Sequence, residues 1–247
     1  MKAMIFAAGL GTRLQQLTAH CPKALVEVNH TPLLYLVLDK LRLSGFNDIV
    51  INVHHFPDQI IDAVQAYPYA SEMHLQISDE REELLNTGGG LKKAFPLFLQ
   101  NKNNEPVLIH NVDILSDADL NALYGSLQND DAQLLVSERQ TSRYFLFNDE
   151  MRLVGWTNIQ TGETRSPYPN MDITKCKRLA FTGIHVVRRS IYQAMKDYTD
   201  SFGITDFYIK ECIRLKIKGF IQPDLHILDI GKPDTILQAP QFIKEFC

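Results

Sequence analysis

Strand-like and helical segments alternate through the first half of the chain, and this alternation constrains the fold more than any other feature. The strand-like segments are Ala3–Ala8, Ile49–His54, His74–Ser78 and Val107–Asn111, and helical patterns lie near Leu33–Ser44, Pro57–Tyr67 and Gly89–Leu99. In the first helical segment, apolar residues recur with the 3.6-residue period of one buried face. The alternation predicts an α/β fold, a Rossmann-like and mostly parallel sheet flanked by helices.

The pattern changes after about residue 132. Short strands are expected at Ala132–Ser137, Tyr144–Asn148 and Leu153–Thr157, without long helices between them, so a hairpin or meander is the natural arrangement. A buried strand at Leu179–Val187, helices at Ser190–Tyr198 and Asp206–Lys216, and a last strand at Leu225–Gly231 follow. Because no linker or repeat divides the chain, we expect one domain over residues 1–247, with a small β-rich insertion and a change of character between residues 131 and 132.

Composition excludes several classes of protein. With a formal net charge of −4, the chain lacks the basic excess of a nucleic-acid-binding surface. No apolar run approaches the roughly 20 residues that span a bilayer, and Met1 leads directly into a strand without a signal peptide. The four cysteines are scattered along the sequence, a pattern typical of free thiols in a reducing compartment. We expect a cytoplasmic protein without nucleic-acid or membrane partners.

The first strand ends in a turn suited to phosphate. Ala3–Ala8 leads into Gly9-Leu10-Gly11-Thr12-Arg13, and Lys23 follows in the segment Pro22–Leu25. A strand that ends in glycines can present several backbone N–H groups at one point, and Arg13 and Lys23 add positive charge. Leu14 stands where the dinucleotide fingerprint requires a third glycine, and no P-loop tripeptide follows. The alternative is a plain tight turn with two solvated cations.

Two aspartates follow predicted strands. Asp113 closes Ile109-His110-Asn111-Val112-Asp113, and Asp229 lies in Leu228-Asp229-Ile230-Gly231. Ligands of open parallel sheets gather beyond the carboxyl ends of the strands, and two carboxylates brought together there suit Mg²⁺. Each aspartate alone could instead be a helix cap or a turn former.

Three consecutive glycines follow Thr87. Because glycine loses much conformational freedom on folding, Thr87-Gly88-Gly89-Gly90 predicts a close approach of the backbone to a ligand or to a neighbouring part of the chain. We expect a loop that leads into the helix near Gly89–Leu99. A flexible surface loop is the alternative.

Taken together and in order, these motifs resemble the sugar-1-phosphate nucleotidyltransferase family. The family signature G-x-G-T-R is matched completely, and its P-K-P is matched as Pro22-Lys23-Ala24, with alanine for the second proline. Asn111-Val112-Asp113 and Asp229-Ile230-Gly231 resemble the two metal-binding segments, with Val112 in place of the usual glycine. The T-G-G-G form is typical of the branch that contains N-acetylmuramate-1-phosphate uridylyltransferases and mannose-1-phosphate guanylyltransferase-like enzymes.

The resemblance implies a reaction in which a nucleoside triphosphate and a sugar 1-phosphate give an NDP-sugar and pyrophosphate. It implies catalytic roles for Arg13 and Lys23 and a Mg²⁺ site at Asp113 and Asp229. The implied nucleotide-binding residues are Ala8, Gly9, Gly11, Thr12, Arg13, Thr87 and Gly88. The implied sugar-phosphate-binding residues are Thr182 and Gly183, in the T-G-I segment. The nucleotide half would be about 1–131 and the sugar-phosphate half about 132–247.

Base and sugar are less well defined. The family's E-K-P motif, which holds the sugar, is absent here, and residues such as Arg143 or Trp156 could substitute for it. The T-G-G-G form favours UTP with N-acetylmuramic acid 1-phosphate or a related amino-sugar phosphate, and GTP with mannose or heptose 1-phosphate is the alternative. A non-catalytic nucleotide or NDP-sugar sensor on the same fold is a further alternative, and the missing glycine at position 14 disfavours an NAD-dependent oxidoreductase.

Overall fold

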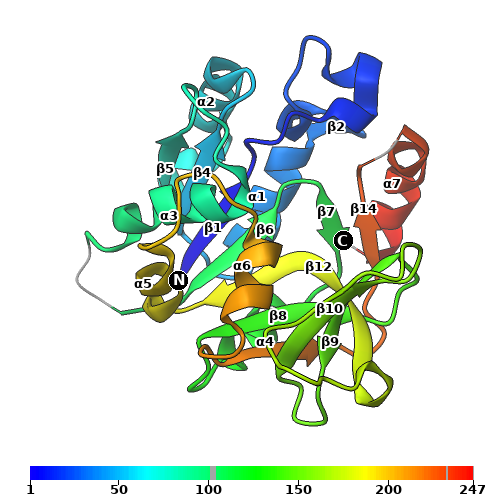
Figure 1. Cartoon of the computed structure of the whole chain (residues 1–247). Coiled ribbons are helices and arrows are strands. Elements are labelled where there is room, and N and C mark those ends of the chain that lie inside the picture. Colours follow the sequence, from blue (N-terminus) through cyan, green and yellow to red (C-terminus); the bar gives the residue numbers. More distant parts are fainter. Residues whose placement is uncertain (101–103, 232, 247) are drawn as a thin grey trace.

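A parallel sheet forms the centre of the molecule in the computed structural model, which describes residues 1–100, 104–231 and 233–246 (Figure 1). Its strands are β1 (Lys2–Phe6), β4 (Asp48–Val53), β5 (His74–Asp79) and β6 (Val107–Asn111). They lie side by side in the order β5-β4-β1-β6, with Met4 opposite both Val50 and Ile109. The predicted Rossmann-like parallel sheet is confirmed.

Antiparallel strands extend the sheet beyond β6. The long strand β12 (Lys177–Val187) runs antiparallel to β6, and its other neighbours are β8 (Ala132–Ser137) and β9 (Arg143–Phe147). The remaining strands of this layer are β10 (Leu153–Asn158), β11 (Thr164–Arg165) and β13 (Ile217–Ile221). They form the expected β-rich layer, which shares strand β12 with the central sheet.

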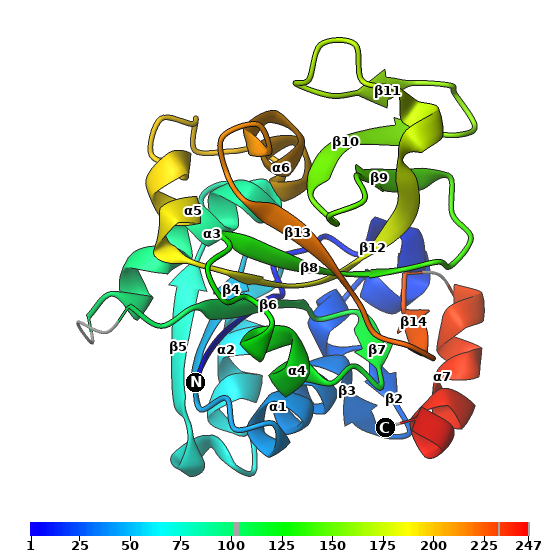
Figure 2. The same cartoon turned by 90° about the horizontal axis from the view of Figure 1, so that it is seen from below.

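Helices cover both faces of the central sheet (Figure 2). The helices α1 (Leu33–Leu43), α2 (Pro57–Gln65) and α4 (Leu120–Gly125) share a buried cluster with Ala3 and Ile5 of β1. The helices α3 (Asn86–Phe98), α5 (Arg189–Met195) and α6 (Ile204–Glu211) share another with Met4 and Phe6. Successive residues of a strand point to opposite faces, so β1 contributes to both cores. Within the described residues, none of these helices is long and apolar enough to cross a lipid bilayer.

A smaller, separate two-stranded sheet brings two distant segments of the chain together. Strand β7 (Ile114–Ser116), which follows directly on β6, pairs antiparallel with β14 (Ile227–Asp229), and helix α7 (Pro233–Phe246) follows. The hairpin β2 (Glu27–Val28) and β3 (Thr31–Pro32) packs on the same unit through a third apolar cluster. Four 3₁₀ helices complete the described elements: Thr12–Thr18, Lys23–Leu25, Ala70–Glu72 and Ile173–Lys175.

The prediction for Thr87–Gly90 is wrong in one respect, because these residues form the first turns of α3 and not a loop before it. The close backbone approach is real. A Cβ on Gly88 would overlap the ring of Phe202, and one on Gly89 would overlap the carbonyl oxygen of Asp200. The neighbour that requires the glycines is therefore the segment before α6.

Other differences concern elements that the sequence pattern did not indicate. Strands β7 and β13 and helices α4 and α7 were not predicted. The helix expected over Asp206–Lys216 runs over Ile204–Glu211 instead, and β13 begins soon after it. The last expected strand, Leu225–Gly231, is shorter than predicted and is β14.

Candidate active site

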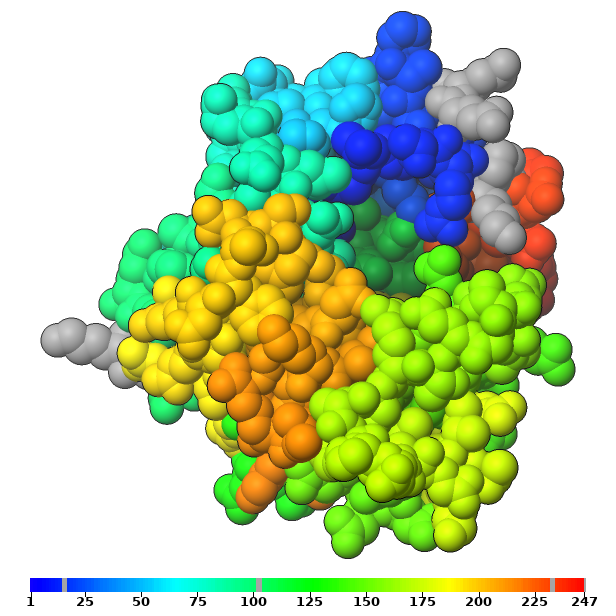
Figure 3. All heavy atoms as spheres, in the orientation of Figure 1, coloured from blue at the N-terminus to red at the C-terminus, as the bar shows by residue number. Residues whose placement is uncertain are grey.

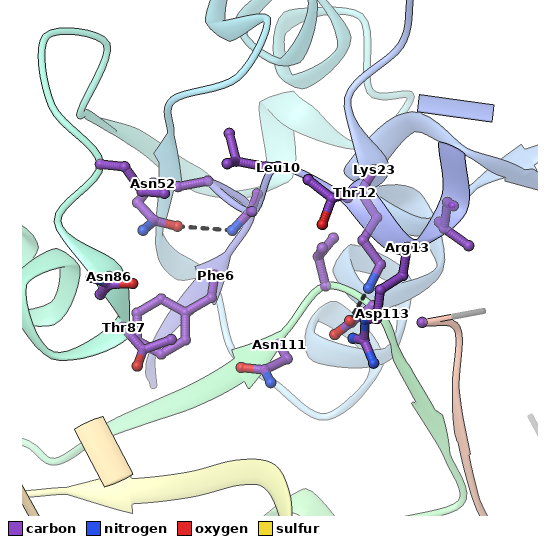
Figure 4. A pocket seen from close by; sticks show the side chains of 18 of the residues that line it. Phe6, Leu10, Thr12, Arg13, Lys23, Asn52, Asn86, Thr87, Asn111 and Asp113 are labelled. Carbon is purple, nitrogen blue, oxygen red and sulfur yellow. Dashed lines mark hydrogen bonds and ion pairs between the residues drawn. The ribbon is translucent and has the colours of Figure 1, made fainter. Parts of the chain in front are cut away.

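A cavity of about 400 Å³ lies beyond the carboxyl ends of β1, β4 and β6. In the space-filling view, the surface of the molecule has a hollow beside the blue N-terminal segment (Figure 3). The polar side chains that line the cavity are Thr12, Arg13, Lys23, Asn52, Glu80, Asn86, Thr87, Asn111 and Asp113. In Figure 4, Arg13, Lys23 and Asp113 gather on one side, while Asn52, Asn86 and Thr87 lie on the other. The cavity thus has one side with both cations and Asp113, and another side lined mainly by amide and hydroxyl groups.

The glycine turn after β1 lines the cavity, and its two glycines serve different needs. Gly11 has a φ of +66°, and a Cβ there would lie 2.8 Å from Cγ2 of Thr18. The fold itself therefore requires glycine at position 11. Gly9 has no atom within 4 Å of the place where a Cβ would be, so the space beside it is open. A ligand, and not the fold, gives a reason for glycine at position 9.

Lys23 and Asp113 form an ion pair at the charged side of the cavity. Lys23 begins a 3₁₀ turn after Pro22, and only 7% of this residue is exposed. Asp113 follows β6 directly, and Val112 packs into the core beside it. The valine at position 112 therefore leaves the carboxylate of Asp113 in the cavity.

Asp229 reaches the same place from the far end of the chain. The backbone N–H of Ile230 donates to the carbonyl oxygen of Asp113 over 2.8 Å, and Asp229 pairs in register with Ile114. Gly231 leaves room for two charged groups, since a Cβ there would lie 2.6 Å from Oδ1 of Asp229 and 2.8 Å from Nη2 of Arg13. The structure therefore brings Asp113, Asp229, Arg13 and Lys23 together.

The two aspartates fit a divalent cation. Burial, followed by the negative charge of Asp113, raises the pKa of Asp229, while Lys23, Arg13 and Arg139 act in the opposite direction. Oδ1 of Asp229 is buried and accepts no hydrogen bond within the described residues. A hard cation such as Mg²⁺ takes carboxylate oxygens and keeps positions open for water and phosphate oxygens. An unpartnered carboxylate oxygen beside a second carboxylate suits such an ion.

The other side of the cavity depends on Asn52 and Glu80. Oδ1 of Asn52 accepts the backbone N–H of Ala7 over 2.8 Å, and its amide nitrogen donates to Oε1 of Glu80 over 2.7 Å. Glu80 is 1% exposed, and burial raises the pKa of its carboxyl group. Glu80 was not predicted from the sequence, and the only signal for it was its place just after the end of β5.

The predicted residues on helix α3 lie in two environments. Thr87 lines the cavity, and its hydroxyl oxygen accepts the backbone N–H of Ile204 over 3.0 Å. Gly88 is buried, and its N–H donates to the carbonyl oxygen of Phe202 over 2.8 Å. Gly88 is therefore engaged by the chain itself and is not part of the cavity lining.

Thr182 and Gly183 also make contacts within the protein. The hydroxyl of Thr182 donates to the carbonyl oxygen of Leu135 over 2.9 Å. Gly183 has a φ of +87°, and a Cβ there would overlap the side-chain amide of Asn111, which lines the cavity. Glycine at position 183 thus leaves the space that the side chain of Asn111 occupies. Neither Thr182 nor Gly183 lines the cavity itself.

The described residues hold no group of three or more histidine, cysteine, aspartate or glutamate side chains suited to a metal ion, so the pair Asp113 and Asp229 is the candidate to hold one. His54 and His55 follow β4 and have different neighbours, since the ring of His55 lies against that of Phe56. Nδ1 of His54 lies 2.7 Å from the carbonyl oxygen of Glu80, a structural contact beside the cavity.

A glycine turn, two cations and two carboxylates, gathered beyond the carboxyl ends of parallel strands, are typical of proteins that bind nucleotide phosphates. The chain belongs to the nucleotidyl transferase family, whose sequence profile matches residues 2–144. This match covers the glycine turn, Lys23 and Asp113, but ends before β12 and Asp229.

Individual relatives are similar to part of the chain. It is 42% identical over 116 residues to an N-acetylmuramate alpha-1-phosphate uridylyltransferase from Caulobacter vibrioides, a stretch that covers 45% of either chain. It is 35% identical over 117 residues to a mannose-1-phosphate guanyltransferase from Aspergillus oryzae, covering 47% of this chain and 31% of that one. The chain thus matches less than half the length of each relative. These similarities confirm the resemblance to the sugar-1-phosphate nucleotidyltransferases.

A solved structure has the same fold over nearly the whole chain. HddC from Yersinia pseudotuberculosis, solved in complex with GMP-PN, superposes with a TM-score of 0.75 and covers 98% of this chain and 99% of its own. The sequence identity is 20%, so this similarity concerns the fold alone. It includes strands β10 to β13, which lie beyond the residues that the family profile matches.

Proposed function

We propose that the protein is a sugar-1-phosphate nucleotidyltransferase, which converts a nucleoside triphosphate and a sugar 1-phosphate to an NDP-sugar and pyrophosphate. The observation that carries the proposal is that Arg13, Lys23 and Asp113 line the cavity beside the open Gly9 turn, and that Asp229 lies next to these three residues, although it is not part of the cavity lining. A site of this kind binds and orients phosphates, and it contains both the positive charge and the paired carboxylates that phosphoryl chemistry uses.

In the proposed reaction, an oxygen of the sugar phosphate attacks the α-phosphorus of the nucleotide in line. The new bond joins that oxygen to the α-phosphorus, the bond from the α-phosphorus to its bridging oxygen breaks, and pyrophosphate leaves with the electron pair. The protein mainly positions two anions and offsets their repulsion. Backbone N–H groups of Gly9–Thr12 and the guanidinium of Arg13 would hold the departing phosphates, and Lys23 would stabilise charge at the α-phosphorus.

Asp113 and Asp229 would hold Mg²⁺. When bound, the ion would neutralise phosphate charge at the reacting centre. Lys23 contacts Asp113 in the structure, so ligand binding would exchange this ion pair for contacts of Lys23 with phosphate. The single domain would thus divide its work between a nucleotide half, residues 1–131, and a sugar-phosphate half, residues 132–247.

For the substrates we propose UTP with N-acetylmuramic acid 1-phosphate or a related amino-sugar phosphate. The similarity to the Caulobacter relative, which is named for that reaction, supports this pair. GTP with mannose or heptose 1-phosphate is the second candidate, and the similarity to the Aspergillus relative supports it.

A non-catalytic nucleotide sensor would not need the two aspartates. Their mutual repulsion and the burial of Asp229 destabilise the ligand-free site, which is a disadvantage in a protein that only binds. This energetic argument favours the enzyme.

The test is a pyrophosphate-release screen of UTP, GTP, CTP and dTTP against a panel of sugar 1-phosphates, with and without Mg²⁺. The proposal expects one strongly preferred pair that depends on Mg²⁺, and loss of turnover in Lys23→Ala. Lys175→Ala, whose side chain is 83% exposed, is the matched control. No release across the panel, with nucleotide binding retained, would favour the sensor.

A further inference from the structure

A second cavity of about 650 Å³ lies in the β-rich layer, in a part of the protein that the motifs left unassigned. Strands β9 and β10 provide Arg143 and Trp156, β12 provides Phe181, and α6 provides Asp206. Helix α6 packs against β10, and the two lie close together in Figure 1. The cavity is therefore built by elements of the second half of the chain.

This second cavity lies next to the candidate active site. Thr205 lines it, and the preceding residue, Ile204, donates its N–H to the hydroxyl of Thr87, which lines the first cavity. Phe181 lines it just before the segment that packs Gly183 against Asn111 of the first cavity. A substrate can therefore extend from the paired aspartates toward the β-rich layer.

The charges around the second cavity are unbalanced. Arg165 is paired with Asp206 over 2.7 Å and with Glu163 over 3.4 Å, and its guanidinium lies 4.3 Å from the ring centroid of Trp156. Both carboxylates of the cavity wall are thus engaged by Arg165, which is a fixed part of that wall.

Arg139 and Arg143 line the same cavity, and within the described residues neither forms an ion pair with a carboxylate. The guanidinium of Arg139 donates to the carbonyl oxygen of Phe181 over 3.2 Å, and its charge acts on Asp229, so it lies toward the reacting centre. Arg143 begins β9, opposite Asn158 of β10, and its guanidinium has no partner among the described residues. An unpaired guanidinium beside a cavity suits a carboxylate or a phosphate, which it can hold with two parallel hydrogen bonds.

We propose that the second cavity receives the sugar of the sugar 1-phosphate and that Arg143 selects sugars that carry a second negative charge besides the 1-phosphate. The proposal rests on the function proposed above, because it assigns the substrate class of the same enzyme. The 1-phosphate itself would lie near Lys23 and the two aspartates, which leaves Arg143 to a more distant group on the sugar. The shared chemistry is an anionic substituent, either a carboxylate or a second phosphate.

Two matched pairs of substrates test the proposal and show whether the anionic substituent is a carboxylate or a phosphate. N-acetylmuramic acid 1-phosphate differs from N-acetylglucosamine 1-phosphate by a lactyl carboxylate, and glucose 1,6-bisphosphate differs from glucose 1-phosphate by a phosphate. The wild type is expected to prefer the charged member of at least one pair, and the preferred pair identifies the group. Arg143→Gln is expected to lower kcat/KM for that member about 10- to 100-fold, mainly through KM. The value of kcat/KM for the member that lacks the second charged group should stay nearly unchanged.

Arg143→Lys retains the charge and should recover part of the preference. Arg178→Gln is the control, because Arg178 is an exposed arginine on β12 that does not line the cavity. Calorimetric titration of the sugar phosphates into the complex of each protein with Mg²⁺ and a nucleotide analogue that cannot release pyrophosphate provides a readout besides turnover, since the loss should appear in the binding constant.

The outcomes distinguish the two proposals. An active wild type that does not discriminate within either pair, or an Arg143→Gln protein that loses both members equally, overturns the role of Arg143 and leaves the nucleotidyltransferase proposal intact. A wild type that releases no pyrophosphate with any sugar phosphate overturns both.

Discussion

Asp229 lies beside Asp113 because β14 pairs with β7, which begins at the residue after Asp113, and because the N–H of Ile230 donates to the carbonyl oxygen of Asp113. A separation of more than a hundred residues in sequence is thus closed by two short strands. Backbone pairing therefore keeps the two carboxylates close together although their charges repel each other.

Replacing each aspartate by asparagine should therefore affect activity alike and stability differently. Both Asp113→Asn and Asp229→Asn are expected to lower kcat at least about 100-fold, because either change removes one of two charged ligands of the ion. Asp113→Asn should also lower the free energy of unfolding by about 2 kcal/mol, because it leaves Lys23 without its ionised partner. Asp229→Asn should be neutral or stabilising without Mg²⁺, because it removes a carboxylate whose pKa burial raises.

Thermal melts with and without Mg²⁺ check this prediction. The wild type should gain stability from the ion and the two variants should not. An equal Mg²⁺-dependent gain in all three proteins would show that the ion binds elsewhere.

The two glycines of the first turn should separate binding from folding. Gly9→Ala is expected to keep or slightly raise stability, by up to about 1 kcal/mol, because a Cβ meets no atom there. It should weaken nucleotide binding about 10-fold or more, because the methyl group occupies the space beside the backbone N–H groups. Gly11→Ala should instead lower stability by about 1–2 kcal/mol, since φ is +66° and Thr18 lies in the way. Urea unfolding and nucleotide titration measure the two effects, and a stable Gly9→Ala protein with unchanged nucleotide affinity would exclude a phosphate beside Gly9.

Local sequence pattern predicted the central sheet and its flanking helices because β1, β4 and α1 are each regular over their own length. It did not predict α7, because Pro233 and Pro240 argue against an uninterrupted helix, and the packing of Ala239 against the cluster around Leu14 is not visible in the sequence. Tertiary contacts overrode the local preference there.

The candidate site shows the same division. Short motifs indicated Gly9, Arg13, Lys23 and the two aspartates, because each lies in a segment whose residue types suit phosphate or a cation. Glu80 was missed, because its partner Asn52 lies 28 residues away and no short motif contains both. Gly88 was expected to bind the nucleotide, but in the fold Phe202 lies against it, and no pattern in the sequence indicates this contact.

The glycines of α3 provide a further prediction about this packing. Alanine is favoured over glycine in helices by about 1 kcal/mol, yet Gly89→Ala should lower stability by more than about 2 kcal/mol, because the new Cβ would overlap the carbonyl oxygen of Asp200. Gly125→Ala, at the end of α4, meets no atom within 4 Å and should be neutral or stabilising. Chemical denaturation of both variants tests the contrast, and a stabilised Gly89→Ala protein would contradict the tight contact between α3 and the segment before α6.

Two histidines in the core should make the protein sensitive to mild acid. Burial lowers the pKa of His110 to about 4 and that of His185 to about 3, and neither ring nitrogen of His185 has a hydrogen-bond partner within the described residues. Below about pH 6.5, where a histidine in the unfolded chain gains its proton, the unfolded state binds more protons than the folded state. Stability should therefore be complete above that pH and fall on acidification toward the folded-state pKa values, by on the order of 1 kcal/mol per pH unit for each histidine.

His185→Phe isolates one of the two contributions. A phenyl ring retains the aromatic contacts with Phe181 and Tyr208 and cannot be protonated. The variant should match or exceed the wild type at pH 7 and lose less stability between pH 6.5 and pH 4.5, as measured by urea unfolding at a series of pH values. If the two proteins lose stability in parallel over that range, His185 is already protonated in the folded state or remains neutral in both states, and the carboxylates of the molecule must account for the acid sensitivity instead.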